Sequence, residues 1–98
     1  MNVLIIGSGG REHALAWKIA QSPNVGTIFV APGNAGTGVE FENVDLQVDD
    51  FEGLIRFAKN NQIGVTIVGP EVPLCLGISD VFLAEGLRVF GPSKLAAQ

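Results

Sequence analysis

The sequence predicts an α/β fold in which a mainly parallel, four-stranded sheet lies between two layers of helices, a three-layer α/β/α arrangement. Short apolar runs typical of strands alternate along the chain with segments typical of helices, and this alternation builds βαβ units around a parallel sheet. The first run, Val3–Ile6, is apolar without a break. Such continuity is typical of a strand that is covered on both faces.

Composition and charge narrow the class of protein. The 98 residues are 47% apolar and 16% charged, which predicts one folded domain. The net charge of −4 and the lack of a basic run argue against a nucleic-acid partner. The sequence has no signal-peptide pattern, no apolar stretch long enough to cross a membrane, and a single cysteine. We therefore expect a cytoplasmic protein with no membrane partner.

The first half of the chain predicts two strands and a helix. A strand over Asn2–Ile6 leads through glycines into a helix expected over Arg11–Gln21. Ser22-Pro23 ends this helix, because a residue that precedes proline avoids the α conformation. Val25–Ala31 reads as the second strand, and the composition of Pro32–Gly38 predicts a loop.

A second helix is expected after Asp49 or Asp50, either of which is a suitable N-cap. Its apolar residues recur at helical spacing, and its charged residues fall on the other side. The apolar set is Phe51, Leu54, Ile55 and Ala58, and the outward set is Glu52, Arg56 and Lys59. The apolar run Ile63–Gly69 predicts the third strand.

The last part of the chain predicts a helix over Leu74–Glu85, with Gly86 as its C-terminal stop, and a fourth strand over 87–91. Ser93 is a suitable cap for one more helix, for which only a few residues remain. Because an isolated short helix is marginal without packing, we expect the chain to be the N-terminal part of a longer protein.

Three loops follow the predicted strands, at 7–13, 31–36 and 69–73, and all are rich in Gly or Pro. The carboxyl ends of parallel strands share one edge of a sheet, where ligands bind in open α/β folds. Tight turns use Gly and Pro for conformational reasons alone, so one such loop indicates little. Three together favour a ligand site at this edge.

The first loop departs from the dinucleotide-binding fingerprint. That pattern needs a third glycine and an acidic residue after the second strand. Gly7 and Gly9 fit, but Glu12 stands in the third position, and the second strand runs into Ala31-Pro32 without an acid. The sequence therefore argues against a bound NAD or FAD.

Two side chains of the first helix are candidates for a role. At 100° per residue, Glu12 projects with the inward residues Leu15, Ala16 and Ile19. It either braces the loop through backbone N–H groups or contacts a ligand. His13 lies at the border of the inward face, where a structural role is favoured over acid–base catalysis. With one His and one Cys, the sequence supports no metal site.

The other two loops also offer polar side chains. Glu71 lies between Pro70 and Pro73, and a carboxylate on so stiff a loop suits the hydroxyls of a ribose. The alternative is a solvated surface acid. Asn34, within Pro-Gly-Asn-Ala-Gly, is either a turn residue in the left-handed region or an amide donor to a ligand.

The motifs VLIIGSGGREHALAWK, APGNAGT, VGPEVPLCLGISD and VFGPSKLAA together resemble the start of the phosphoribosylamine–glycine ligase family, the glycinamide ribonucleotide synthetases. The resemblance covers essentially the whole chain. It implies that residues 1–98 are a Rossmann-like pre-ATP-grasp domain, without the ATP-grasp and C-terminal domains that follow in this family. It also implies an ATP-dependent carbon–nitrogen ligase of purine biosynthesis, whose ATP and Mg²⁺ sites lie in those other domains.

Carried onto this sequence, the resemblance implies a phosphoribosylamine site lined by all three loops. The residues are Gly9, Gly10, Glu12, Pro32, Gly33, Asn34, Glu71 and Pro73. No catalytic or metal-binding residue is implied in this chain, which we expect to be inactive alone.

The partners expected are the substrate and the other domains, which would cover an apolar patch through which the isolated chain could self-associate. The alternatives are a free-standing module that binds a nucleotide or acyl-CoA, and a non-catalytic interaction domain.

Overall fold

The computed structural model describes residues 1–69 and 75–90, without the side chains of residues 75 and 76. Within this part of the chain, five parallel strands form one sheet in the order β3-β2-β1-β4-β5. The strands are β1 (Asn2–Gly7), β2 (Ile28–Pro32), β3 (Glu42–Asn43), β4 (Ile63–Val68) and β5 (Val89–Phe90). The predicted fold class is confirmed, with β3 as an additional strand.

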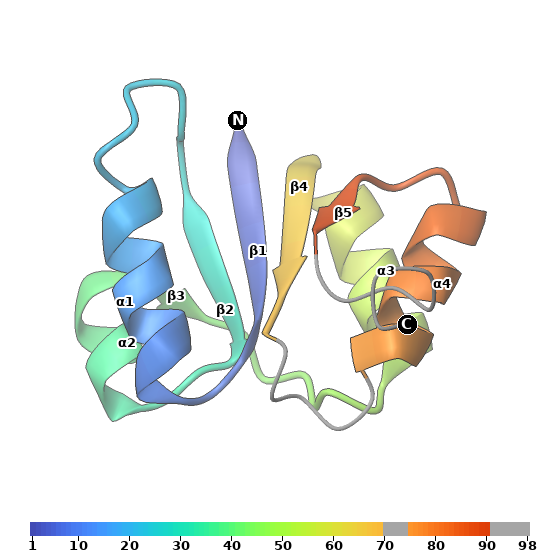
Figure 1. Cartoon of the computed structure of the whole chain (residues 1–98), viewed down its shortest axis with the longest axis horizontal. Helices are drawn as coiled ribbons and strands as arrows, with labels where there is room; N and C mark the ends of the chain where they lie inside the picture. Colours follow the sequence, from blue (N-terminus) through green and yellow to red (C-terminus); the bar gives the residue numbers. More distant parts are fainter. Residues whose placement is uncertain (70–74, 91–98) are drawn as a thin grey trace.

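The helices form a layer on each side of the sheet. Figure 1 shows α1 (Gly10–Ile19) and α2 (Ala35–Glu40) on one face, and α3 (Phe51–Asn60) and α4 (Cys75–Ala84) on the other. The chain winds outward from β1 to β3 on one side, and from β4 to β5 on the other. The strand order therefore reverses between β1 and β4, and a crevice outside the carboxyl ends of strands is the usual ligand site in such sheets.

The residues of β1 explain why the sheet is covered on both faces. Val3 and Ile5 pack with Ala16 of α1, whereas Leu4 and Ile6 pack with residues of α3 and α4. All four strand residues are at most 1% exposed. Full burial of an aliphatic side chain contributes on the order of 1.5–3 kcal/mol, so the unbroken apolar run stabilises both helical layers.

The boundaries of α3 and α4 follow from their sequences. Asp50 is the N-cap of α3, and its Oδ1 accepts the Gly53 N–H at 3.0 Å. At the end of α4, Gly86 has a φ of +76°. The Leu87 N–H bonds to the Phe82 carbonyl at 2.9 Å, and the Gly86 N–H to the Leu83 carbonyl at 3.0 Å. This is the Schellman arrangement, which confirms Gly86 as the predicted stop.

Several boundaries differ from the sequence prediction, among them the fourth strand, which was expected over 87–91 and covers only Val89–Phe90. The strand expected from Val25 begins at Ile28, because the Val25 N–H bonds to Ser22 in a turn instead of joining the ladder. The first helix ends at Ile19, two residues early. The predicted loop 32–38 contains the start of α2, which the Asn34 side chain caps.

Other expectations fall beyond the described residues, namely most of the third loop and the helix expected from Ser93. No helix in the described ranges has the length and apolarity needed to cross a membrane.

Candidate functional site

The ends of β1, β2 and β4 lie side by side at the lower edge of the sheet in Figure 1. The Gly33 N–H donates to the Gly7 carbonyl at 3.1 Å, and the Gly69 N–H donates to the Ile6 carbonyl at 3.2 Å. These bonds extend the sheet ladders into the loops on either side of β1. The predicted convergence of the three loops is thus confirmed for the residues at which they leave the strands. Glu71 and Pro73 lie outside the described residues.

The first loop is closed by its own carboxylate. Glu12 is 1% exposed, and its Oε2 accepts the Gly9 N–H at 3.2 Å. Gly7 has a φ of +150°, and a Cβ on Gly7 would overlap the Glu12 carboxylate, 2.5 Å from its Cδ. Only glycine suits this conformation and contact. The structure therefore gives Glu12 the bracing role that the sequence left open.

The bracing also explains the missing third glycine. In a dinucleotide-binding turn, that glycine permits close packing of helix and strand around a pyrophosphate. Here the buried Glu12 side chain fills the space between α1 and Gly7. The geometry thus supports the argument against a dinucleotide.

The start of α1 remains open at its outer side. Gly9 is the N-cap with an extended backbone, and Gly10 is the first helical residue. Both are exposed, and a Cβ on Gly10 would meet no atom within 4 Å. The N–H groups of the first turn point out of a helix, where they favour anionic groups. Gly10 therefore offers a backbone donor with space for a ligand.

The second loop carries the left-handed residue at Gly33, with a φ of +75°, and not at Asn34. Asn34 is extended, with φ −147° and ψ −176°, so the interpretation of Asn34 as a left-handed turn residue is wrong. Its Oδ1 accepts the Thr37 N–H at 2.9 Å, and its Nδ2 donates to the Ser8 carbonyl at 2.7 Å. Asn34 thus caps α2 and joins the second loop to the first. Pro32, half-buried at the end of β2, follows Ala31 through a cis peptide bond.

Two residues that the sequence analysis missed complete this arrangement. Thr37 is fully buried, and its Oγ1 accepts the Asn34 N–H at 2.8 Å. The same hydroxyl is 2.7 Å from Asn43 Oδ1, and Asn43 Nδ2 donates to the Asn34 carbonyl at 2.7 Å. The spacing of Asn34 and Thr37 matches a capping pair, which was the available signal. No local pattern pointed to Asn43.

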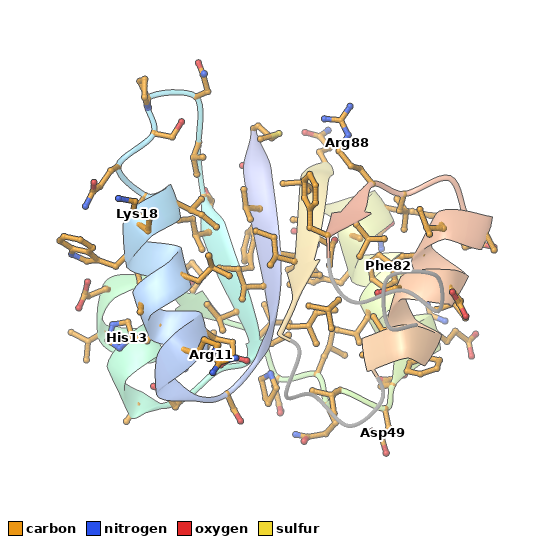
Figure 2. All side chains as sticks on the ribbon, viewed as in Figure 1. Arg11, His13, Lys18, Asp49, Phe82 and Arg88 are labelled. Atoms are coloured by element: carbon orange, nitrogen blue, oxygen red, sulfur yellow. The ribbon has the colours of Figure 1, made fainter. Side chains whose placement is uncertain are left out.

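His13 has structural partners, as expected. Its Nε2 lies 3.3 Å from Glu40 Oε1, and its ring meets the edge of Phe41 at a centroid distance of 6.1 Å. Figure 2 shows it between α1 and α2. His13 and Glu40 border a hollow of about 480 Å³ on the outer side of α1 and α2, which Gly10, Ala14 and Trp17 also line. Because Gly10 is the first residue of α1, one end of this hollow reaches the start of that helix.

The surface described holds several exposed apolar side chains, including Trp17 at 58%, Val39 at 85% and Phe90 at 64%. They come from different elements, so the single apolar patch remains a prediction. Among the described residues, no group of three or more His, Cys, Asp or Glu side chains is arranged to hold a metal ion.

The whole chain, residues 1–98, matches the family described as phosphoribosylglycinamide synthetase, N domain. It is 66% identical over its whole length to the phosphoribosylamine–glycine ligase of Vibrio vulnificus and 60% identical to that of Haemophilus influenzae. The ligase of Rhodopirellula baltica is 60% identical over 99% of the chain. The chain spans 22–23% of the length of these curated relatives. It belongs to the family of phosphoribosylglycinamide synthetase N domains.

Proposed function

We propose that this chain is the substrate-binding N-terminal domain of an ATP-dependent ligase of purine biosynthesis. The complete cytoplasmic enzyme joins 5-phosphoribosylamine and glycine to give glycinamide ribonucleotide, ADP and phosphate. Glycine and ATP form an acyl phosphate, the amine of phosphoribosylamine attacks its carbonyl carbon, and phosphate leaves as the amide forms. In this proposal, ATP and Mg²⁺ bind to the remainder of the full-length chain, and residues 1–98 alone turn over no ATP.

The adjacency of the three strand ends from which the loops leave carries the proposal. Gly33 and Gly69 hydrogen bond to the end of β1 from opposite sides, and the open start of α1 lies at the same edge. Exposed backbone N–H groups at a helix N-terminus suit a phosphate, and a carboxylate suits the hydroxyls of a ribose. In this proposal, the start of α1 supplies the N–H groups and Glu71 supplies the carboxylate.

Within this site, each loop has its own part. Gly9 and Gly10 present the start of α1, while Glu12 holds that turn from beneath. Pro32, Gly33 and Asn34 form the wall on the β2 side. We assign Glu71 and Pro73 to the wall on the β4 side.

Glu71→Gln in the full-length enzyme tests the assignment. We expect the KM for phosphoribosylamine to rise roughly tenfold or more, as fits the loss of a hydrogen bond to a charged group. The KM values for ATP and glycine should change less than about twofold, because the amide keeps the size of the side chain. Steady-state kinetics with each substrate varied in turn measure this. Unchanged phosphoribosylamine kinetics would leave Glu71 a surface acid.

The alternative function is a free-standing module, which would bind a dinucleotide or an acyl-CoA. Calorimetric titration of the chain with NAD and with acetyl-CoA should show no saturable heat. A micromolar affinity for either ligand would favour that alternative over the ligase domain.

A further inference from the structure

Asn43 bonds to the second loop from the edge strand β3. Its Oδ1 lies 2.7 Å from Thr37 Oγ1, and its Nδ2 lies 2.7 Å from the Asn34 carbonyl oxygen. The carbonyl oxygen can only accept a hydrogen bond, so it fixes which side of the amide faces it. The Thr37 hydroxyl accepts the Asn34 N–H, and its one proton faces two acceptors, Asn43 Oδ1 at 2.7 Å and the Asn34 carbonyl at 3.0 Å. The shorter of these two contacts is the one to Asn43.

The same side chain also packs against two glycines. A Cβ on Gly33 would lie 2.6 Å from Asn43 Cγ, and a Cβ on Gly38 would lie 2.9 Å from Asn43 Nδ2. Gly33 has a positive φ. Glycine can adopt many other backbone conformations as well, so contacts are needed to select this one. The Asn43 amide thus holds the left-handed residue of the second loop by contact and by hydrogen bonds to its neighbours.

The cluster continues from Asn43 to the first loop. Asn43 and Thr37 both bond to Asn34, and Asn34 Nδ2 donates to the Ser8 carbonyl at 2.7 Å. A path of short hydrogen bonds thus runs from the edge of the sheet to the residue before Gly9. Its bonds end on the backbone of both loops, so Asn43 influences the distance between the loops.

We propose that Asn43 is a positioning residue for the phosphoribosylamine site, which fixes Gly33 and Asn34 relative to Ser8. This inference rests on the proposed function. Asn43 is exposed and lies on a strand of two residues. Its side chain therefore contributes little buried area to the stability of the fold. Its effect falls on the geometry of the site, and small displacements of binding groups are costly to substrate recognition.

The test compares Asn43→Asp and Asn43→Leu in the full-length enzyme. Aspartate keeps the acceptor for Thr37 but turns an oxygen toward the Asn34 carbonyl, and leucine removes both bonds without adding charge. Both variants should raise the KM for phosphoribosylamine roughly tenfold, the scale of one hydrogen bond that the displaced second loop no longer makes to the substrate. The KM values for ATP and glycine should stay within about twofold.

Asn24→Asp is the matched control, because Asn24 is exposed at the opposite end of the sheet, where its carbonyl meets the amino terminus. This control should leave all three KM values unchanged. Thr37→Val provides a second way to break the same cluster. Its effect on the phosphoribosylamine KM should be similar, and the double variant with Asn43→Leu should fall short of the summed effects.

An unchanged phosphoribosylamine KM in both Asn43 variants would overturn the inference. A parallel rise in all three KM values would also overturn it, because a general structural role predicts that pattern. If the Asn43 variants do not fold, Thr37→Val decides by the same criterion. A wild-type enzyme with no phosphoribosylamine-dependent turnover would instead refute the proposed function, and the inference with it.

Discussion

The two helical layers stabilise the sheet in different ways. The layer of α3 and α4 adds Leu54, Ala58, Ile78 and Phe82 to the buried apolar cluster, whereas the layer of α1 and α2 adds Ala16. Instead of further apolar side chains, α1 and α2 bury Glu12 and Thr37, whose side chains hydrogen bond to the backbone of the loops. In the described part of the chain, the buried Ser79 hydroxyl of α4 has no such partner.

This difference separates stability from site geometry. Burial of apolar area stabilises a fold without regard to direction, whereas hydrogen bonds position groups at defined distances. The loops at the carboxyl edge depend on Glu12 and on the Asn34, Thr37 and Asn43 cluster. We therefore expect changes in the α3/α4 layer to affect unfolding, and changes beside the loops to affect substrate binding.

The largest effect on stability is expected for Phe82→Ala. Phe82 is fully buried against the sheet (Figure 2), and truncation of such a side chain costs about 3–5 kcal/mol in free energy of unfolding. Chemical denaturation measures this, with Leu83→Ala as the control. Leu83 is 56% exposed and should cost less than about 0.5 kcal/mol. The phosphoribosylamine KM of folded Phe82→Ala enzyme should not change. A raised phosphoribosylamine KM would contradict the separation of stability from site geometry.

Gly7→Ala should have an intermediate effect that falls on both properties. The φ of +150° and the overlap of a Cβ with the Glu12 carboxylate oppose any side chain. A residue held in such a conformation costs on the order of 1–3 kcal/mol, and displacement of Glu12 would release the Gly9 N–H. Denaturation and kinetics together should show lower stability and a higher phosphoribosylamine KM. Wild-type values for both would contradict the close contact between Gly7 and Glu12.

Gly10→Ala should have the smallest effect on stability. It separates stability from substrate binding most clearly, because the two effects should have opposite signs. Its Cβ meets no neighbour, and alanine favours a helix by up to about 1 kcal/mol over glycine. Thermal unfolding should therefore shift slightly upward. If substrate approaches the Gly10 backbone, the new methyl group obstructs it, and the phosphoribosylamine KM should rise several-fold. An unchanged KM would remove Gly10 from the site.

The sequence was sufficient for the layers and insufficient for the loop contacts. Periodicity predicted the inward position of Glu12. Residue type predicted the caps, Asp49 or Asp50 at the start of α3 and Gly86 after α4, because a cap depends on neighbours within one element. Asn43 could not be predicted, since its partners are nine and six residues away across a helix. The short α2 was taken for a loop because glycine, a weak helix former, occurs twice in it.

The role of the carboxyl edge is tested most directly by a crystal structure of the full-length enzyme with glycinamide ribonucleotide bound. We expect the phosphoribosyl group to lie between the loops at 7–13, 31–36 and 69–73. Its oxygens should be within about 3.2 Å of backbone N–H donors at the start of α1 or in the second loop. A phosphoribosyl group bound elsewhere, or adenine of ATP between these loops, would contradict the account.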